Sequence, residues 1–363
     1  MGRSLSKDTA RVLLIILVFT SLGCSTKKTV EISAKFLPKN YVAYQTKTAP
    51  TIDGDFEEAA WTAIEWSADF IDIEGVKTPK YKTQLKMMWD QDHLYFLAKL
   101  EEPHIWGNLK QRDTIIFYNN DIELFIDPDG DTHDYMEVEM NALNTVWDLF
   151  LDRPYRNGGS ADNRWNIQGL KTAVAFNGSL NNPIDIDKYW TVEIAIPWAG
   201  LTKGNPSGKI PVNDFWRMNF SRVHWDHDIS NGKYSRKKDS SGNFVREYNW
   251  VWSSQGVINM HQPEKWGYVY FAETLEGQKI TPPQPKDVEL IQWMYCNYRV
   301  WLETSNKKSS SEQCAPLFDK DTALAMKKIN GELYWMATSP NTKITYSIRS
   351  DGKLITDKAS KTE

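Results

Sequence analysis

Three acidic side chains in the first half of the chain have a spacing that could serve chemistry. Glu123 lies in the segment 121–127, and Glu137 and Glu139 lie in the segment 135–141; both segments alternate polar and apolar residues. Side chains of a strand point alternately to its two faces, so Glu137 and Glu139 share one face. A face of this kind can hydrogen-bond the hydroxyls of a sugar, or it can belong to a buried polar network.

Hydrolysis is a weaker hypothesis for the same residues. The Cα atoms of Glu137 and Glu139 are expected roughly 6.6 Å apart on a strand, which falls within the carboxylate separation of inverting glycosidases. Catalytic carboxylates must flank the scissile bond from opposite sides, whereas neighbours on one strand point the same way. The pair therefore argues little for a glycoside hydrolase.

Other polar and aromatic residues extend the candidate binding set. Hydrogen-bonding candidates besides Glu123 and Glu139 are Asn141, Arg153, Arg222, His224, Asn259 and His261. Candidate aromatic platforms are Trp147, Tyr155, Trp165 and Trp225. A structural salt bridge is the alternative for Glu139 and Arg222, and core packing is the alternative for Trp147 and Trp225. His104 and His133 are expected to be isolated and exposed to solvent.

A second acidic group has the 1-3-5 spacing of a calcium loop. It consists of Asp127, Asp129 and Asp131, and carboxylate oxygens are preferred calcium ligands. Gly130 stands at the fourth position and no Glu stands at the twelfth, so the loop is not an EF-hand. An Asp-rich hairpin turn is the alternative. No Cys/His spacing suggests zinc, and no phosphate loop or nucleophile elbow is found.

The composition is that of a globular protein with many aromatic residues. The 363 residues are 41% hydrophobic and 25% charged, with 16 Trp and 16 Tyr. A net charge of -4 gives no electrostatic footprint for nucleic acid. Trp and Tyr at this density fill β-sandwich cores and also form flat platforms for sugar rings.

The N-terminus is predicted to be a lipoprotein signal peptide, residues 1–24. Basic residues precede an apolar run, 12–19, that is too short to span a bilayer. The run ends in Ser21-Leu22-Gly23-Cys24, which resembles a bacterial lipobox, with plain secretion as the alternative. Lipid attached to Cys24 would place the chain in the cell envelope, on the outer membrane or facing the periplasm, with 25–39 as a tether.

Residues 40–273 are predicted to form an antiparallel β-sandwich, so the chain is mostly β. The predicted strands are 42–47, 83–89, 93–100, 121–127, 135–142, 145–151, 171–176, 190–197, 215–225, 249–253 and 266–272. Many short strands with turns between them and little helix are typical of this class. A short helix is expected within 56–66, and the hydrophilic loop 227–246 is expected to be mobile.

A small α+β extension is predicted at the C-terminus. Pro-rich residues within 274–286 form a linker, and 287–363 contains a helix over 288–303 followed by a small hairpin. Cys296 and Cys314 either pair or stay free in this oxidising compartment. The extension could bind a protein partner; an exposed aromatic stripe on its helix would favour that role.

Four motifs resemble the family 9 carbohydrate-binding modules, and the resemblance spans about residues 40–273. They are Thr51-Ile52-Asp53-Gly54 with Trp61, then Met88-Trp89-Asp90 with His93-Leu94-Tyr95-Phe96, then Asn120 to Asp127, and finally Trp252-Ser253 with Pro263 to Gly267. The segments 141–144, 219–222 and 255–261 look like a subgroup of lipoproteins from Bacteroidetes-type bacteria. The resemblance implies a jelly-roll-type sandwich, related to DOMON domains, that binds saccharides and often holds structural calcium.

The same resemblance places the family's binding residues on this chain. Two tryptophans that sandwich a sugar fall at Phe117, beside Tyr118, and at Met260. A family Glu falls on Glu123, and a family Arg falls near Glu139. The aromatic clamp is therefore not kept, and specificity for reducing ends does not carry over. We expect a non-catalytic saccharide-binding lipoprotein that supports glycan capture or breakdown, with a glycoside hydrolase or a protein-binding assembly subunit as alternatives.

Overall fold

The structure, a computed structural model, describes residues 28–30, 37–275, 277–278, 280–305, 312–314 and 322–357. The predicted signal peptide, the lipidation site Cys24 and most of the predicted tether lie outside these ranges. Within them, no helix is long and apolar enough to cross a bilayer.

Most of the chain forms one sheet of 13 strands. The strands are β2 (Asn40–Gln45), β3 (Ile71–Asp72), β4 (Thr83–Trp89), β5 (His93–Glu101), β6 (Asp121–Asp127), β7 (Tyr135–Asn141), β8 (Val146–Leu151), β9 (Ala161–Asp162), β10 (Lys171–Asn177), β11 (Tyr189–Pro197), β12 (Phe215–His224), β15 (Tyr248–Val251) and β16 (Gly267–Leu275). Their order is β10-β11-β5-β4-β2-β16-β12-β6-β7-β8-β9, with β15 and β3 attached beside β12. Each strand predicted between residues 42 and 272 is present, and the mostly β class is confirmed.

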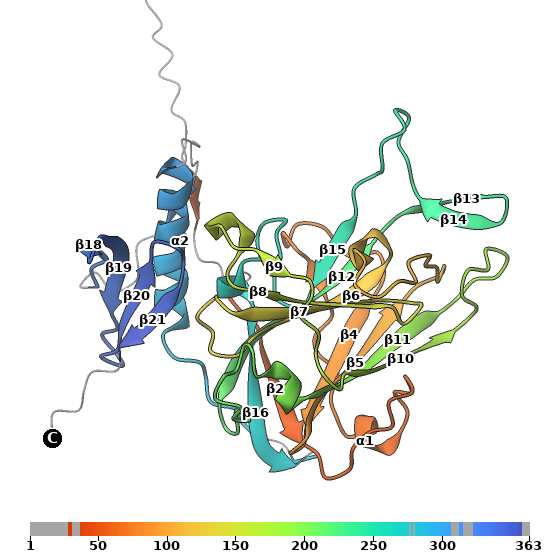
Figure 1. Cartoon of the computed structure of the whole chain (residues 1–363), viewed down its shortest axis with the longest axis horizontal. Coiled ribbons are helices and arrows are strands. Elements are labelled where there is room, and N and C mark those ends of the chain that lie inside the picture. The colour runs from red at the N-terminus through yellow and green to blue at the C-terminus, as the bar shows by residue number, and fades with distance from the viewer. Residues whose placement is uncertain are drawn as a thin grey trace, which may run out of the picture.

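The sheet folds over so that its two halves face each other across the main core (Figure 1). Leu85, Phe96 and Ile194 enter this core from one half, and Leu124 and Phe220 enter it from the other. The rings of Phe96 and Phe220 meet with centroids 5.7 Å apart. Each of these strands directs alternate apolar residues inward, and two such faces packed together form a sandwich.

The arrangement differs from the predicted antiparallel one at a single strand, β2. It lies parallel to both β4 and β16, whereas the other pairs of this sheet are antiparallel. Strand β2, the first of this sheet, therefore joins the two halves, because it pairs with β4 on one side and with β16 on the other. The indole of Trp89 stabilises the pairing of β2 with β16, because its Nε1 donates to the carbonyl oxygens of Ala43 (3.1 Å) and Ala272 (3.2 Å).

Strands β6 and β7 are buried on both faces, which the alternation of polar and apolar residues did not indicate. One face packs in the main core. The other lies under a second apolar cluster that includes Phe125, Tyr135 and Met260. Alternation along a strand separates its residues into two faces, but it does not reveal that a loop covers the polar one.

Two local predictions also need correction. The helix expected within 56–66 is only one turn, α1 (Ala59–Thr62), although Trp61 points inward as expected and its Nε1 donates to Glu193 (2.7 Å). The loop 227–246 contains a hairpin of β13 (His227–Ser230) and β14 (Lys233–Arg236).

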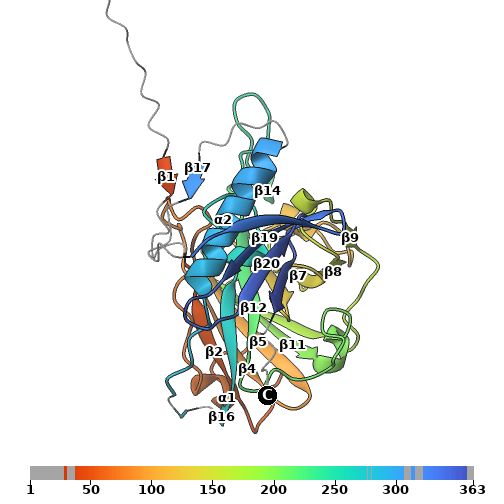
Figure 2. The same cartoon turned by 90° about the vertical axis from the view of Figure 1, so that its left-hand side faces the viewer.

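The C-terminal extension consists of a helix packed on a small sheet (Figures 1 and 2). Its elements are α2 (Val288–Ser305), β18 (Ala325–Ile329), β19 (Glu332–Thr338), β20 (Thr345–Arg349) and β21 (Leu354–Asp357). Leu290, Met294 and Tyr298, four residues apart along α2, pack with Trp335 and Ile348 of the sheet. The predicted helix and hairpin are present, and two outer strands extend the hairpin to a four-stranded sheet.

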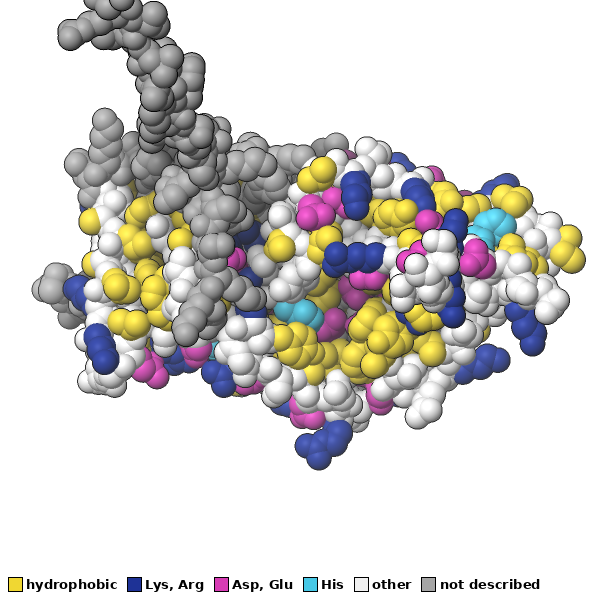
Figure 3. All heavy atoms as spheres, turned by 90° about the horizontal axis from the view of Figure 1, so that it is seen from above, with side chains coloured by type: hydrophobic (Ala, Val, Ile, Leu, Met, Phe, Trp, Pro, Cys, Tyr) yellow, Lys and Arg dark blue, Asp and Glu magenta, His cyan; other side chains and the backbone are white. Residues whose placement is uncertain are grey.

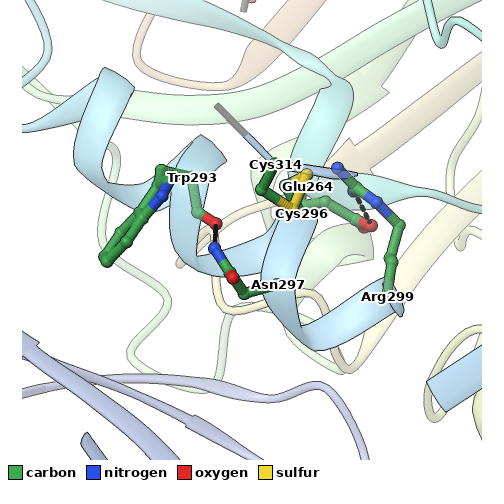
Figure 4. The surroundings of a disulfide bond; sticks show 6 residues. All are labelled: Glu264, Trp293, Cys296, Asn297, Arg299 and Cys314. Carbon is green, nitrogen blue, oxygen red and sulfur yellow. Dashed lines mark hydrogen bonds and ion pairs between the residues drawn. A yellow bond between two sulfur atoms is a disulfide. The ribbon is translucent and has the colours of Figure 1, made fainter. Parts of the chain in front are cut away.

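Glu264 of the sandwich holds the extension in place (Figure 4). It lies between Arg156, in the loop after β8, and Arg299 of α2, whose Nη1 is 2.8 Å from Glu264 Oε1. Burial favours the neutral acid, but the two guanidinium groups outweigh it and lower the pKa of Glu264 to about 2. The carboxylate is therefore ionised and fully paired.

A disulfide joins α2 to β17 (Glu312–Cys314), so the structure forms the pair that the sequence left open (Figure 4). The Cα atoms of Cys296 and Cys314 are 5.9 Å apart. Strand β17 in turn pairs with β1 (Lys28–Val30) in a parallel register. The disulfide therefore connects the helix to the segment that follows the predicted N-terminal anchor.

Candidate functional site

A cavity of about 360 Å³ opens on the covered face of β6, β7 and β8. Figure 3 shows a hollow on this side of the molecule, with acidic side chains and a histidine at its bottom and hydrophobic side chains around them. Its lining comprises Ile73, Phe117, Glu123, Phe125, Glu137, Glu139, Trp147, Leu149, Tyr155, Val223, Arg246, Glu247, Asn249, Ile258, Asn259, Met260 and His261.

The register of the strands brings the carboxylates of the floor together. Ser221 of β12 pairs with Glu123 of β6, and Glu123 pairs with Glu139 of β7, which pairs with Trp147 of β8. Paired residues of an antiparallel sheet have Cβ atoms about 4.5–5.5 Å apart on the same face. Two acids that are distant in sequence thus become direct neighbours.

These floor acids are buried and form no ion pair among the described residues, although Arg246 lines the same cavity. Asp121, Glu123, Glu137 and Glu139 are at most 5% exposed. No ion pair among the described residues includes any of the four. Burial, followed by the neighbouring carboxylates, raises the pKa of Asp121, Glu137 and Glu139 well above their usual values, and burial raises the pKa of Glu123 to about 7.

Few hydrogen bonds of the protein satisfy this floor. The backbone N–H of Phe117 donates to Glu139 Oε2 (3.0 Å), and that of Val223 donates to Asp121 Oδ1 (3.3 Å). The other carboxylate oxygen of Asp121 and the hydroxyl of Ser221 are buried and have no partner at hydrogen-bonding geometry. The floor therefore keeps unused acceptor capacity.

Aromatic rings form the walls of the cavity. Phe117 and Trp147 stack with centroids 6.5 Å apart and planes 28° apart. Tyr155, 47% exposed, meets the ring of His261 edge-on at 4.6 Å. Burial, followed by the charge of Arg156, lowers the pKa of His261 to about 4, so the imidazole is neutral at pH 7 and its Nδ1 lies 2.9 Å from the hydroxyl of Tyr135. Flat apolar faces thus stand above a polar floor.

Seven of the binding residues predicted from sequence line this cavity. They are Phe117, Glu123, Glu139, Trp147, Tyr155, Asn259 and His261. The four positions that match the family's binding residues, Phe117, Met260, Glu123 and Glu139, all belong to it. The structure also adds Arg246, Glu247 and Asn249, which no motif marked because they lie in and after a long hydrophilic loop.

Arg222 and His224 lie on the opposite face of β12, which corrects their assignment to the site. Arg222 is fully buried, and its guanidinium donates to Glu102 (2.9 Å) and to the hydroxyl of Thr83 (3.0 Å). His224 Nδ1 is 3.2 Å from the same carboxylate of Glu102. They form the buried structural network that was the alternative for Arg222.

Asn141 and Arg153 also lie outside the cavity. Asn141 is fully buried, and its side-chain Oδ1 accepts hydrogen bonds from the backbone N–H groups of Leu143 (3.0 Å) and Thr145 (3.1 Å), so the side chain stabilises the turn after β7. Arg153 faces Asp152 and the C-terminal extension, with Nη1 3.9 Å from Asp351.

Tyr118 and Trp225 lie beside the cavity rather than in it. Both rings pack against the guanidinium of Arg236, each 4.6 Å from its central carbon. Trp225 also donates from Nε1 to the carbonyl of Phe117 (2.8 Å), which is next to Tyr118. Both residues contact the wall residue Phe117. Trp225 is buried, as the alternative of core packing predicted.

The acidic loop after β6 is a turn against the C-terminal extension. Asp127 accepts the backbone N–H groups of Gly130 (3.0 Å) and Thr132 (2.9 Å). Lys353 Nζ is 2.7 Å from Asp131 Oδ2. His133, expected to be exposed, is buried here, with Nε2 3.3 Å from Asp351. Asp127, Asp129 and Asp131 nevertheless each offer an oxygen within 4.8 Å of the others.

One protein-family model matches most of this chain. The model described as "Carbohydrate family 9 binding domain-like" matches residues 52–273, which is more than half of the sequence. This range contains every residue that lines the cavity.

Two curated proteins share part of the sequence. Endo-1,4-beta-xylanase A of Thermoanaerobacterium saccharolyticum is 28% identical over 156 residues, 43% of this chain and 11% of that protein. Exoglucanase XynX of Acetivibrio thermocellus is 26% identical over 153 residues, 42% of this chain and 12% of that protein. The chain thus matches only about a tenth of the length of these relatives.

Solved structures with a similar fold include two carbohydrate-related proteins. A family 9 carbohydrate binding module from Caldicellulosiruptor kristjanssonii, in complex with cellotriose, is 19% identical with a TM-score of 0.42, covering 68% of this chain and 100% of that one. A putative carbohydrate-binding protein from Bacteroides uniformis is 12% identical with a TM-score of 0.47, covering 64% and 99%.

Proposed function

We propose, because this chain belongs to the carbohydrate family 9 binding domain-like family, that it binds a saccharide without cleaving it, in the cavity above β6, β7 and β8. The observation that carries the proposal is the combination of aromatic walls, with Phe117 and Trp147 stacked, and the buried carboxyl groups of Glu123, Glu137 and Glu139 in one open cavity. Sugar rings present flat C–H faces to aromatic side chains and hydroxyl donors to carboxylates, so both halves of the site have a use.

The size of the cavity favours a short or terminal saccharide. Ligand pockets span roughly 300–1,000 Å³, and this one, at about 360 Å³, is at the lower end of that range. It therefore suits the end of a glycan chain or a small oligosaccharide better than a long polymer segment. An open, solvated site of this kind is expected to bind with micromolar or weaker affinity.

Glu137 and Glu139 project from one strand onto the same face, which supports binding rather than hydrolysis. An inverting or retaining mechanism needs two carboxylates on either side of the scissile bond. The aromatic residues of α2 do not support the protein-partner alternative, because none of Trp293, Tyr295, Tyr298 and Trp301 is exposed.

The proposal extends to the location of the protein and to calcium. We place the chain in the cell envelope, held by lipid on Cys24, where it would capture glycans or support their breakdown. Calcium would bind Asp127 and Asp129, because their oxygens lie close together, and would compete with Lys353 for Asp131.

Calorimetric titration tests the binding function. We would titrate the chain from Ser25 onward with xylo- and cello-oligosaccharides, chosen because the curated relatives are a xylanase and an exoglucanase. Trp147→Ala should weaken binding at least about tenfold by removing a wall. Phe176→Ala, which removes an exposed aromatic ring of β10 outside the lining of the cavity, is the matched control and should bind like the parent.

The outcomes separate the hypotheses. Saturable binding that Trp147→Ala weakens and Phe176→Ala leaves intact supports the proposal. Binding that both changes weaken equally would move the site away from this cavity. Shortened products after prolonged incubation with the oligosaccharide would replace binding with hydrolysis.

A further inference from the structure

We propose that the floor of the cavity is a calcium site formed by Asp121, Glu123 and Glu139, and that the saccharide binds through hydroxyl groups coordinated to this ion. The second half of the inference rests on the proposed function. The first half, the ion itself, stands on the residues of the floor alone.

The geometry of the three acids suits calcium. Asp121, Glu123 and Glu139 each offer a carboxylate oxygen, and these oxygens lie within 4.8 Å of one another. Calcium binds oxygens at about 2.3–2.6 Å, so ligands on opposite sides of the ion are about 5 Å apart. Calcium also tolerates irregular sets of carboxylates, whereas magnesium demands a near-ideal octahedron and keeps several waters.

The charge of the floor calls for a cation. Buried carboxylates in proteins are paired or coordinate metals, because an isolated buried charge is very costly. Two other buried carboxylates of the chain are paired in this way, since Glu102 has Arg222 and Glu264 has two arginines. Among the described residues, the floor acids alone combine near-complete burial, close grouping and the absence of any ion pair.

Two buried polar atoms of the floor have no partner at hydrogen-bonding geometry; one belongs to the acids, and the other, close to Glu123, is independent of them. One is Asp121 Oδ2, in a side chain that is 0% exposed. The other is the hydroxyl of Ser221, also 0% exposed, which is not acidic and lies in register with Glu123 on the same face. An ion at the floor would satisfy Asp121 directly, and a water bound to the ion would reach the Ser221 hydroxyl.

The position of the ion would leave coordination sites open to the cavity. Calcium takes about six to eight oxygens, and three carboxylates do not fill that number. Glu123 and Glu139 line the cavity, whereas Asp121 is not part of its lining. The remaining positions would therefore face the cavity, where adjacent hydroxyls of a sugar ring can coordinate the ion while the ring packs against an aromatic wall.

The register of the strands agrees with this arrangement. Glu139 places a second carboxyl group directly beside that of Glu123, and ionised carboxylates only accept hydrogen bonds, so the pair offers ligands for a cation.

Calcium titration of chelator-treated protein tests the ion site. The parent chain should bind calcium at the floor and, by the proposal above, at the loop of Asp127 and Asp129. Glu139→Gln should abolish the floor site, and Asp129→Asn, the matched control on the other acidic cluster, should leave it intact. Terbium luminescence excited through tryptophan provides a second readout, because Trp147 lies in register with Glu139.

Saccharide titrations with calcium or with chelator test the bridging role. Affinity should fall at least tenfold in chelator and in Glu139→Gln, while Asp129→Asn should match the parent. If Glu139→Gln fails to fold, as judged by circular dichroism, Glu123→Gln takes its place.

Each contrary result has a distinct meaning. Calcium binding that neither glutamine variant alters would overturn the ion site. Equal saccharide affinity with calcium and with chelator would overturn the bridging role and leave the proposed function standing. Binding of calcium but of no saccharide under any condition would overturn the bridging role and the proposed function together.

Discussion

Two sets of buried carboxylates in this protein have opposite surroundings. Glu264 is 1% exposed and lies between Arg156 and Arg299 at the junction of the sandwich and the extension. The acids of the cavity floor, such as Glu123 and Glu139, are also buried but form no ion pair among the described residues. The pKa of Glu264 is lowered to about 2, whereas burial raises the pKa of Glu123 to about 7.

The contrast distinguishes acids that stabilise the tertiary structure from acids that are available to bind a ligand. A buried charge that stabilises tertiary structure needs its partner within the chain, because desolvation otherwise outweighs any gain. A charge left without such a partner lowers stability, and a protein keeps it where function requires it. This difference leads to three tests, from the largest expected effect to the smallest.

Removing Glu264 should have the largest effect on stability. Glu264→Ala leaves two guanidinium groups without their common partner and should lower the free energy of unfolding by about 3 kcal/mol or more. Urea denaturation measures this loss. Glu289→Ala, at an exposed acid in the first turn of α2, is the control and should change stability little; similar losses in both variants would contradict the assigned role of Glu264.

Acidification should destabilise the protein in two steps. His261 has a pKa lowered to about 4 from 6.5 by burial and Arg156. The unfolded chain therefore takes up a proton first, and stability should fall as pH drops from 6.5 towards 4. Glu264, with a pKa lowered to about 2 from 4.5, contributes stability above pH 4.5 that is lost as pH falls towards 2.

Each of these shifts is worth up to about 3 kcal/mol at one unit per 1.4 kcal/mol. Thermal unfolding at a series of pH values measures the loss. His261→Gln should remove the step between pH 6.5 and 4 while leaving the lower step. The floor acids, whose pKa values are raised, change stability in the opposite direction over this range, so the parent is compared with His261→Gln; equal pH dependence of the two between pH 6.5 and 4 would contradict the burial of a neutral His261.

Neutralising one acid of the floor should have the smallest effect, and of the opposite sign. Glu137→Gln replaces a buried acid, whose raised pKa shows that its charge is disfavoured, by a neutral amide, so in calcium-free buffer the free energy of unfolding should stay constant or rise by about 1 kcal/mol. Glu264→Gln, the same substitution at a paired acid, should lower it. Chemical denaturation of both variants in parallel makes the comparison, and a clear loss in Glu137→Gln would show that this acid has a stabilising partner.

Strand positions and motifs were determined by the sequence alone. Alternating residues marked the strands of the sandwich because side chains of a strand alternate with a period of two. The same alternation placed Glu137 and Glu139 on one face, and the structure confirms this. The helix 288–303 was likewise predicted from apolar spacing and is present as α2. These features depend on neighbours in sequence, which a single chain displays directly.

Only the tertiary structure decided which residues meet in the cavity. Arg222 was placed in the site because periodicity defines two faces of a strand without saying which one meets the core. Its partner, Glu102, is 120 residues away. His261 and Tyr135, 126 residues apart, meet because the loop before β16 folds over β7. Register between strands and the path of covering loops arise from packing across the whole sandwich, so local sequence could not reveal that the acidic face is buried and lacks a cation.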